Sequence, residues 1–429
     1  MSSEVVGEAI GRAVDGVSGH GSGGVVAPVS GGVAAPIDLA ALLPVLDPSL
    51  EGSRTLPAEA YLSSDMLHWE LRHFFEGSWA CVGRADELRG PGDQVAVRVG
   101  TEGILLVRGK DGELRGYFNT CRHRGHELLA CGESRNVNAI KCPYHAWVYG
   151  LDGALKGAPR FGDVPGFDRG EYPLIDVPVK EWMGWVFVNP DGEAPDLGTY
   201  LGNLGELIAD WEPERTFVAA RHEYVVKANW KTVVENYQEC YHCPSIHPAL
   251  CKVTPVDSGE YFQHTGAVIG GSMELMDFAQ TMSFTGESQG VNFRALNEKQ
   301  RREVYYYGVF PNLLISLHPD YIMTHRLYPL APGEVWIECS FLFPPEAKER
   351  PDFDPAYAWE FWDATNREDF AACESVFRGM TSSGYRQGPF AVQEDEVHAF
   401  MHMIALGYVE GRITKAPDID YAGPSGIAS

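Results

Sequence analysis

Two short stretches of the sequence, CRHRGHELL and CPYHAW, each combine a cysteine with a histidine. One residue separates Cys121 from His123, and two residues separate Cys142 from His145. Four side chains of this kind can bind a single metal centre only where two loops meet at one point. A glycine in the first stretch and a proline in the second suit tight loops. The pattern therefore predicts a small domain that brings these two loops together.

The spacing of these residues also limits which metal centre they hold. Zinc fingers generally space two cysteines by about two to four residues and two histidines by about three to five. Each half-site here instead mixes one cysteine with one histidine. If both cysteines bind one iron and both histidines bind the other, each loop supplies one ligand to each iron of a [2Fe–2S] cluster, which is the Rieske arrangement. Structural zinc and a chance pairing of buried side chains are the alternatives.

The texture of the sequence predicts how the chain is divided. Residues 1–52 are rich in Gly, Ala, Val and Ser and predict a disordered tail, and a helical segment is expected at 53–77. Short strand-like runs separated by turns predict an antiparallel β domain at 78–190 that carries the Cys/His loops. Longer strands and helices then predict a second domain, so the expected fold class is α+β. The remaining predicted segments are a connector at 191–215, the second domain at 216–420 and a C-terminal tail at 421–429.

A second group of candidate ligands occurs in the stretch NWKTVVENYQECYHCPSIHPAL, where Glu239, His242 and His247 lie within nine residues. On a helix, Glu239 and His242 share a face, and Pro244 would break that helix so that His247 returns to the same point. Two imidazoles and one carboxylate from elsewhere form the facial triad of non-haem Fe(II) oxygenases, with positions open for O2. Two surface histidines at a helix end, or a metal site built on the C-x2-C pair around His242, are the alternatives.

The third ligand of such a site must be a carboxylate from later in the chain. The stretch FWDATNREDFAACESV offers several, and helical periodicity places Asp369 on the same stripe as Ala372, Cys373 and Val376. A carboxylate that faces the core needs compensation, which iron supplies. Asp369 is therefore the predicted ligand, and Asp363 is the alternative.

Residues 121–145 resemble the Rieske motif of the Rieske non-haem iron oxygenases, and ENYQECYHCPSIHP resembles the iron-binding stretch of the same enzymes, so the resemblance spans most of residues 60–420. It implies a Rieske domain, a helix-grip-like catalytic domain, a [2Fe–2S] cluster and a mononuclear Fe(II). Glu239 matches the acidic residue that links the iron to the Rieske cluster of a neighbouring subunit, which implies a homotrimer. A separate flavin and iron–sulfur reductase is implied as electron donor, because no nucleotide-binding motif occurs in this chain.

Within that family, the sequence most resembles oxygenases of quaternary ammonium compounds: glycine betaine, stachydrine, carnitine and choline. The resemblance implies O2-dependent hydroxylation of an N-methyl group, with glycine betaine as the expected substrate and dimethylglycine and formaldehyde as products. Aromatic faces hold a methylated ammonium through cation–π contact, so the substrate candidates are Tyr305, Tyr307 and Phe310, with His325 for a carboxylate. Stachydrine demethylation, aromatic-ring dihydroxylation and a Rieske electron carrier are the alternative functions.

Bulk composition argues against several other classes. The chain has 59 acidic and 34 basic side chains and a formal net charge of −25, which disfavours nucleic acid and anionic membranes as partners. No apolar run approaches the ~18 residues that cross a bilayer, and the N-terminus lacks the apolar core of a secretory signal. A cytoplasmic location is therefore expected. Nine cysteines spread over a long chain with no secretory signal argue against a disulfide framework.

Overall fold

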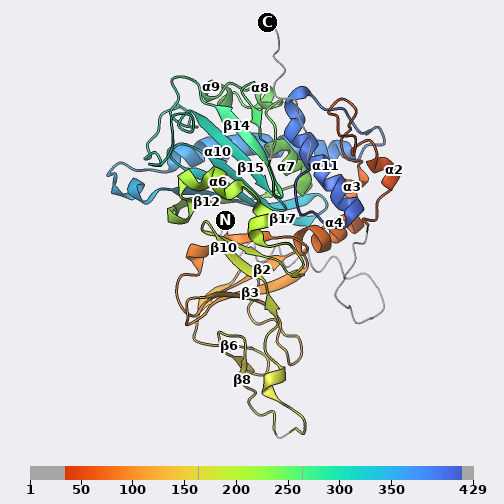
Figure 1. The fold of residues 1–429 in the computed structure, drawn as a ribbon, viewed down its shortest axis with the longest axis vertical. Helices are drawn as coiled ribbons and strands as arrows, with labels where there is room; N and C mark the ends of the chain where they lie inside the picture. The colour runs from red at the N-terminus through yellow and green to blue at the C-terminus, as the bar shows by residue number, and fades with distance from the viewer. Residues whose placement is uncertain (1–33, 163, 263, 418–429) are drawn as a thin grey trace. The chain divides into compact units, whose positions relative to one another are not determined.

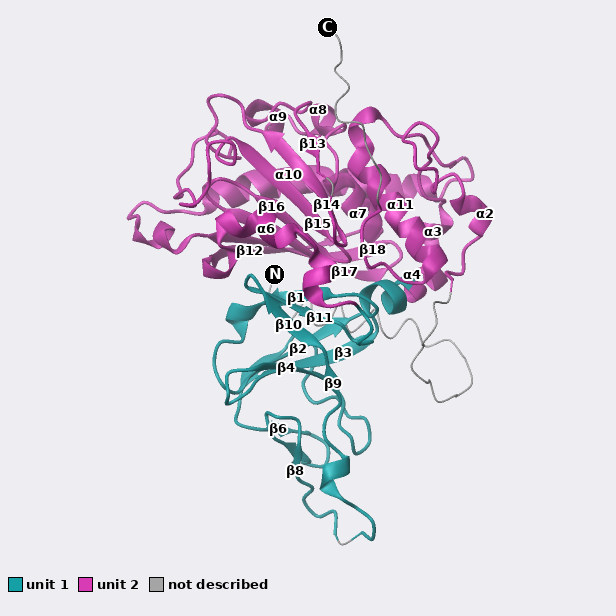
Figure 2. Ribbon diagram, in the orientation of Figure 1, with its two compact units in different colours: residues 1–28, 70–194 teal, residues 29–69, 195–429 magenta. Residues whose placement is uncertain are grey.

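A computed structural model describes residues 34–417 of the chain, except 163 and 263. The described residues form two compact units, one of residues 70–194 and one of residues 34–69 together with 195–417 (Figure 2). From residue 34 onward, the described chain therefore starts in the second unit, forms the first, and returns to complete the second. No helix among these residues combines the length and the apolar character that a membrane span requires.

The first unit consists of short antiparallel strands. Its sheets have the strand orders β5-β2-β3-β4-β9, β1-β11-β10 and β6-β7-β8. Leu105 and Val107, two residues apart and therefore on one face of β3, lie in an apolar core that also contains Tyr117 and the two predicted cysteine ligands. The sheet core thus continues into the two metal loops. The elements are η1 Leu71–Phe75, β1 Ala80–Arg84, η2 Ala85–Glu87, β2 Asp93–Val99, β3 Glu102–Arg108, β4 Leu114–Phe118, β5 Ser134–Asn136, β6 Ile140–Lys141, β7 Val148–Tyr149, β8 Leu155–Gly157, η3 Arg169–Glu171, β9 Asp176–Val177, β10 Val179–Trp182 and β11 Trp185–Val188.

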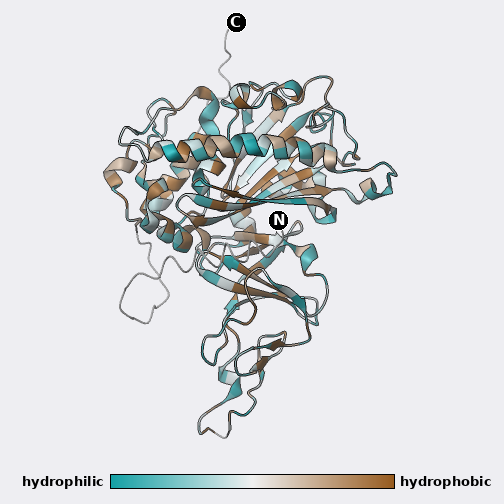
Figure 3. Ribbon diagram, turned by 180° about the vertical axis from the view of Figure 1, so that it is seen from behind, coloured by the Kyte–Doolittle hydropathy of each residue, from teal (hydrophilic) through white to brown (hydrophobic). Residues whose placement is uncertain are grey.

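The second unit is built on a seven-stranded antiparallel sheet with the order β12-β18-β17-β16-β15-β14-β13, and the long helix α10 crosses one face of it (Figure 1). Phe341 and Phe343 of β18 belong to the same buried hydrophobic cluster as Phe361 of α10. In Figure 3 the long helix alternates between hydrophilic and hydrophobic residues, as expected for one buried face.

The sheet of the second unit comprises β12 Phe217–Val226, β13 Glu260–Tyr261, β14 Val268–Glu274, β15 Glu303–Val309, β16 Leu313–Leu317, β17 Ile322–Ala331 and β18 Glu334–Phe343. Its helices and turns are α2 Leu39–Leu42, α3 Glu59–Leu62, α4 Ser64–Glu70, α5 Leu197–Leu201, α6 Leu204–Ile208, η4 Ala209–Trp211, η5 Pro213–Arg215, α7 Trp230–Tyr237, α8 Cys243–Ile246, α9 Leu250–Val253, η6 Pro345–Glu349, α10 Ala356–Met380, η7 Val392–Glu394 and α11 Asp395–Glu410.

The structure confirms the predicted α+β class but moves two segment boundaries. Leu42 and Val45 are fully buried, and Ala35 donates a backbone hydrogen bond to Tyr408, so the part of the predicted tail from residue 34 to residue 52 is ordered. These few apolar side chains are anchored by residues near the other end of the chain, which local composition does not reveal. The predicted connector at 191–215 is also wrong, since residues from 195 onward belong to the second unit. The predicted tails at 1–33 and 421–429 lie outside the described residues.

Candidate metal centres

The first candidate centre lies on two loops of the first unit. Cys121 and Cys142 are buried, with 3% and 1% of their surfaces exposed. The rings of His123 and His145 have their centroids 4.6 Å apart at an interplanar angle of 78°. Each loop turns back directly after its cysteine, because Gly125 N donates to Cys121 O and Ala146 N donates to Cys142 O. The four predicted ligands are thereby gathered at one place.

The surroundings of these loops fit an iron–sulfur cluster. His123 Nδ1 is buried without a hydrogen-bond partner among the described residues. Burial and the nearby His145 lower the pKa of His123, which favours the neutral imidazole that binds metals. Trp147 stacks on His123 with 4.9 Å between centroids, and the Tyr149 hydroxyl lies 3.3 Å from Cys121 Sγ. These two aromatic side chains fix the orientation of one ligand of each type.

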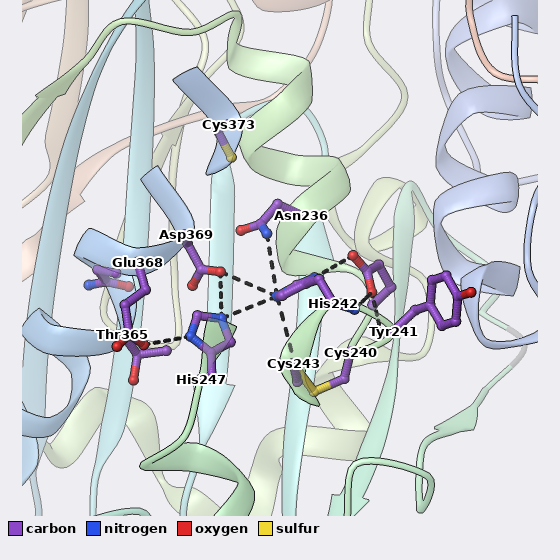
Figure 4. A network of polar contacts seen from close by, with 12 residues as sticks. Asn236, Cys240, Tyr241, His242, Cys243, His247, Thr365, Glu368, Asp369 and Cys373 are labelled. Carbon is purple, nitrogen blue, oxygen red and sulfur yellow. Dashed lines mark hydrogen bonds and ion pairs between the residues drawn. A yellow bond between two sulfur atoms is a disulfide. The ribbon is translucent and has the colours of Figure 1, made fainter. Parts of the chain in front are cut away.

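The second candidate centre lies in the second unit and joins two histidines that are five positions apart to an aspartate far along the chain (Figure 4). Asp369 Oδ1 lies 2.7 Å from His247 Nε2 and 3.3 Å from His242 Nε2, and the two Nε2 atoms are 3.2 Å apart. Ligand atoms at about 2.1 Å from one metal and at right angles stand about 3 Å from one another. The donor atoms therefore have the spacing of three adjacent ligands of a single ion.

The outer nitrogens of both imidazoles face carboxylates. His247 Nδ1 lies 2.8 Å from Glu368 Oε2, and His242 Nδ1 contacts Glu239 Oε1. A ligating histidine usually donates its second N–H to such a partner, which leaves the other nitrogen free for the metal. In the metal-free protein, burial opposes charge on His242, but hydrogen bonds to Asp369 and Glu239 outweigh it and raise its pKa to about 9. Metal binding must displace this proton.

The local chain around Glu239 differs from the predicted continuous helix. Helix α7 ends at Tyr237, and the Glu239 carboxylate accepts hydrogen bonds from the backbone N–H groups of Tyr241 and His242. Pro244 lies in the first turn of α8 instead of ending a helix. A side chain that binds nearby backbone N–H groups competes with helix formation, and periodicity alone does not detect this. The prediction that Glu239 and His242 share a helical face is wrong, although the two side chains do meet.

Two predicted alternatives lose their basis in the structure. Cys240 and Cys243 form a disulfide, so the C-x2-C pair around His242 has no thiolates to offer a metal. Asp363 accepts hydrogen bonds from Tyr224 Oη at 2.7 Å and Arg367 Nε at 2.8 Å. It is therefore engaged elsewhere, and Asp369 is the carboxylate that reaches the histidines.

A cavity of about 820 Å³ adjoins the second centre and is lined by all three of its candidate ligands. Of the predicted substrate residues, His325 lines it, whereas Tyr305, Tyr307 and Phe310 are not among its described lining residues. Successive side chains of a strand point to opposite faces, and on β15 the tyrosine that lines the cavity is Tyr306. The predicted tyrosines Tyr305 and Tyr307 therefore lie on the opposite face of β15 from the cavity.

Sequence reasoning also missed lining residues from other elements. Asn236, Tyr237 and Gln238 come from the end of α7, and Trp362 comes from α10. Asn236 Nδ2 lies 3.4 Å from His242 Nε2. The first three belong to the ENYQ stretch that also precedes the ligands, so their closeness to His242 in the chain was the available signal. Nothing comparable marked Trp362.

Comparisons with known proteins agree with both centres. Residues 78–168 match the model of the Rieske [2Fe-2S] domain, and residues 213–406 match that of the ring hydroxylating alpha subunit, catalytic domain. The chain is 31% identical over 337 residues to the carnitine monooxygenase oxygenase subunit of Escherichia coli strain K12, covering 77% of this chain and 86% of that protein. It is 29% identical over 371 residues to the glycine betaine monooxygenase oxygenase subunit of Chromohalobacter salexigens, with 80% and 82% covered.

A solved structure extends the similarity to the fold. The solved structure of a quaternary ammonium Rieske monooxygenase, described in connection with carnitine oxidation and inter-subunit electron transfer, superposes with a TM-score of 0.74 at 28% identity. The match covers 88% of this chain and 100% of that one. Both units of the structure are therefore shared with this relative.

Proposed function

This chain belongs to the Rieske non-haem iron oxygenases, as an oxygenase α subunit with a Rieske [2Fe–2S] cluster and a mononuclear iron, and from that premise we propose that it hydroxylates an N-methyl group of a quaternary ammonium compound. The hydroxylated methyl group then loses its hydroxyl proton and leaves as formaldehyde. The carbon–nitrogen bond breaks in this step, and the nitrogen keeps the electron pair as a tertiary amine. Electrons come from a separate reductase, and O2 is the oxidant. Glycine betaine, converted to dimethylglycine, is the substrate that the sequence ranks first.

The observation that carries this proposal is the convergence of His242, His247 and Asp369 beside the large cavity. A protein that only carries electrons needs no second metal site and no substrate cavity. When bound, the cluster would supply electrons singly and the mononuclear iron would activate O2. We assign Cys121, His123, Cys142 and His145 to the cluster, and His242, His247 and Asp369 to the mononuclear iron.

The remaining polar side chains of the site have positioning roles. Glu239 holds His242 through Nδ1, and Glu368 holds His247 through Nδ1, so that each Nε2 faces the metal position. Only 11% of the Glu239 side chain is exposed. We propose that Glu239 also passes electrons from the Rieske cluster of a neighbouring subunit, which requires a ring of subunits, most simply a homotrimer.

The cavity supports an ammonium ligand through its aromatic side chains. Tyr237, Tyr306 and Trp362 line it, and the rings of Tyr237 and Tyr306 meet edge to face with centroids 5.9 Å apart. A methylated ammonium cannot donate a hydrogen bond, and aromatic faces attract it through the ring quadrupole. Aromatic-ring dihydroxylation would use the same iron ligands but gives no reason for a cavity rich in carboxylates, so demethylation is the preferred reaction.

A single-turnover experiment tests the proposal without the native reductase. The iron-loaded protein is reduced under anaerobic conditions and mixed with O2 and, separately, with glycine betaine, choline, carnitine or stachydrine, and formaldehyde is measured. We expect formaldehyde near the amount of intact mononuclear sites with at least one of these compounds. If none of them yields formaldehyde while iron content and the Rieske spectrum are intact, quaternary ammonium demethylation is wrong, and simple aromatic compounds become the next substrates to test.

A further inference from the structure

The cavity beside the iron ligands is lined by acidic side chains, with no lysine or arginine among its described lining residues. Seven of these residues carry a carboxyl group. Glu239 and Asp369 belong to the iron site, which leaves five carboxylates around the rest of the cavity. These are Glu51, Asp257, Glu260, Asp395 and Glu396.

Two of these carboxylates, Asp395 and Glu396, are partly buried where α11 begins. A Cβ atom at Gly271 of β14 would stand only 2.5 Å from Glu396 Oε1, so the glycine leaves room for the Glu396 carboxylate to lie against the strand. Burial and the neighbouring Asp395 raise the pKa of Glu396 well above its ordinary range. Burial also raises the pKa of Asp395. Both carboxyl groups thus lack a cation that would stabilise their ionised forms.

Two basic side chains that contact lining residues of the cavity already have partners. Lys299 Nζ lies 3.5 Å from both Glu260 and Glu303 and is 60% exposed. Arg54 donates hydrogen bonds to the backbone carbonyls of Glu51, Gly52 and Ser53. A carboxylate-bearing ligand would therefore meet no free lysine or arginine among the described lining residues.

Two buried polar side chains of the lining also indicate the kind of ligand. Gln238 is 3% exposed, and neither its Oε1 nor its Nε2 has a partner among the described residues. His325 is 5% exposed; its Nε2 lies 3.2 Å from Asn366 Oδ1, so Nε2 is the protonated nitrogen, and Nδ1 is an acceptor without a partner. The Gln238 amide can donate or accept, so it suits a hydroxyl group or a carboxylate, whereas His325 Nδ1 requires a donor. A hydroxyl group can donate to His325 Nδ1, and a carboxylate cannot.

We propose that this cavity selects, within the quaternary ammonium class, a ligand with a net positive charge and a hydroxyl group over a zwitterion with a carboxylate, and that Glu396 contributes to this selection. Choline has this chemistry, whereas glycine betaine differs from it in having a carboxylate in place of the hydroxymethyl group. The inference rests on the proposed function for the class of substrate and revises the ranking of glycine betaine as the first substrate. Its physical basis is that a ligand cation would stabilise the ionised forms of Asp395 and Glu396, whereas a ligand carboxylate would oppose their ionisation.

A purely structural role for the same carboxylates must be separated from this one. Asp395 and Glu396 lie in the first turn of α11, where carboxylates favour a helix through its dipole. Loss of that effect would destabilise the protein but would weaken the binding of choline and the binding of glycine betaine equally. Selectivity between the two ligands is therefore the quantity to measure.

The test is calorimetric titration of the anaerobic, iron-loaded enzyme with choline and with glycine betaine. We expect choline to bind at least ~10-fold more tightly. Glu396→Gln should reduce this ratio by ~3-fold to ~10-fold, chiefly by weakening choline. Glu410→Gln, at the exposed last residue of the same helix, is the matched control and should leave the ratio unchanged. Asp395→Asn provides a second variant if Glu396→Gln does not fold, and it should also lower the ratio.

Equal or tighter binding of glycine betaine to the unaltered enzyme overturns the inference, and so does a ratio that survives both substitutions. Failure of this inference can be distinguished from failure of the proposed demethylation. Preferential choline binding without formaldehyde from any quaternary ammonium compound would sustain the charge selection and refute demethylation. Formaldehyde from glycine betaine together with tighter binding of glycine betaine would support demethylation and refute the charge selection.

Discussion

The two candidate metal centres differ in how far apart their ligands lie in the sequence. The proposed Rieske ligands lie between Cys121 and His145, on two loops that return to the core of one small β unit. The proposed mononuclear ligands include His247 and Asp369, which are 122 positions apart and come from different segments of a larger sheet unit. The first centre can therefore be recognised from spacing, whereas the second depends on long-range packing to bring its carboxylate to its histidines.

The largest effect should come from disrupting the proposed Rieske centre, whose ligands are close together in the sequence. Cys142→Ser removes a thiolate that is 1% exposed in the core of the first unit, so we expect the cluster not to assemble. Iron should fall from about three to about one per chain, with loss of the Rieske visible spectrum and of reductase-dependent turnover. Cys131→Ser, a partly exposed cysteine of the same unit, should retain both. Retention of the cluster by Cys142→Ser would contradict the assignment.

The complementary substitution disrupts the proposed mononuclear iron site, whose ligands are far apart in the sequence. Asp369→Asn removes the anionic ligand, and we expect loss of the mononuclear iron and a fall in activity of more than ~100-fold, with the Rieske spectrum unchanged. Iron analysis and single turnover measure this. Asp363→Asn is the control, because that residue is held by Tyr224 and Arg367. Iron loss in Asp363→Asn and not in Asp369→Asn would reverse the assignment between them.

A smaller change should sharpen the comparison by loosening the long-range site without removing a ligand. Glu368→Ala deletes the carboxylate that orients His247, so we expect Fe(II) affinity to weaken about 10-fold to 100-fold. Anaerobic titration of the metal-free protein with Fe(II) gives the affinity. Glu360→Ala, an exposed glutamate on the same helix, should bind iron as the unaltered protein does. Unchanged affinity in Glu368→Ala would remove its positioning role.

The smallest expected effect concerns stability. Glu235 of α7 is 9% exposed, and burial raises its pKa to about 7 despite the hydrogen bond from Tyr61 and the charge of Lys231. An unfolded glutamate titrates near ~4.3, so the folded state holds an extra proton between pH ~4.3 and ~7, and its stability falls as pH rises through that window.

Glu235→Gln should remove this dependence. The Tm of the variant minus the Tm of the unaltered protein should increase by about 2–4 °C from pH 5 to pH 8. Thermal unfolding of both proteins at both pH values measures this difference. A difference in Tm that is the same at both pH values would show that Glu235 does not titrate in this range.

Local patterns in the sequence predicted several elements well. The helical periodicity predicted around Asp369 is confirmed by helix α10, which occupies residues 356–380. The same periodicity placed Asp369 on the inner side of α10, and the structure brings it to His242 and His247. The assignment of these ligands is still to be tested by experiment.

Other predictions failed where a non-local contact decided the outcome. The order of residues 34–52 depends on burial of Leu42 and Val45 and on a hydrogen bond to Tyr408. The end of α7 depends on where the Glu239 carboxylate finds its backbone donors. The choice of Tyr306 over its neighbours for the cavity depends on which face of β15 adjoins the iron site. None of these relations leaves a periodic signal.

The sequence by itself therefore determined the ligand chemistry and the family, because ligand type and short spacing are properties of neighbouring residues. Only the tertiary structure decided which carboxylates surround the substrate cavity. Glu51, Asp257 and Glu396 come from segments far apart in the chain, and they line one cavity only after the sheet and its helices have packed. The proposed charge selection therefore depends on the fold, whereas the types of metal ligand could be predicted from short stretches of sequence.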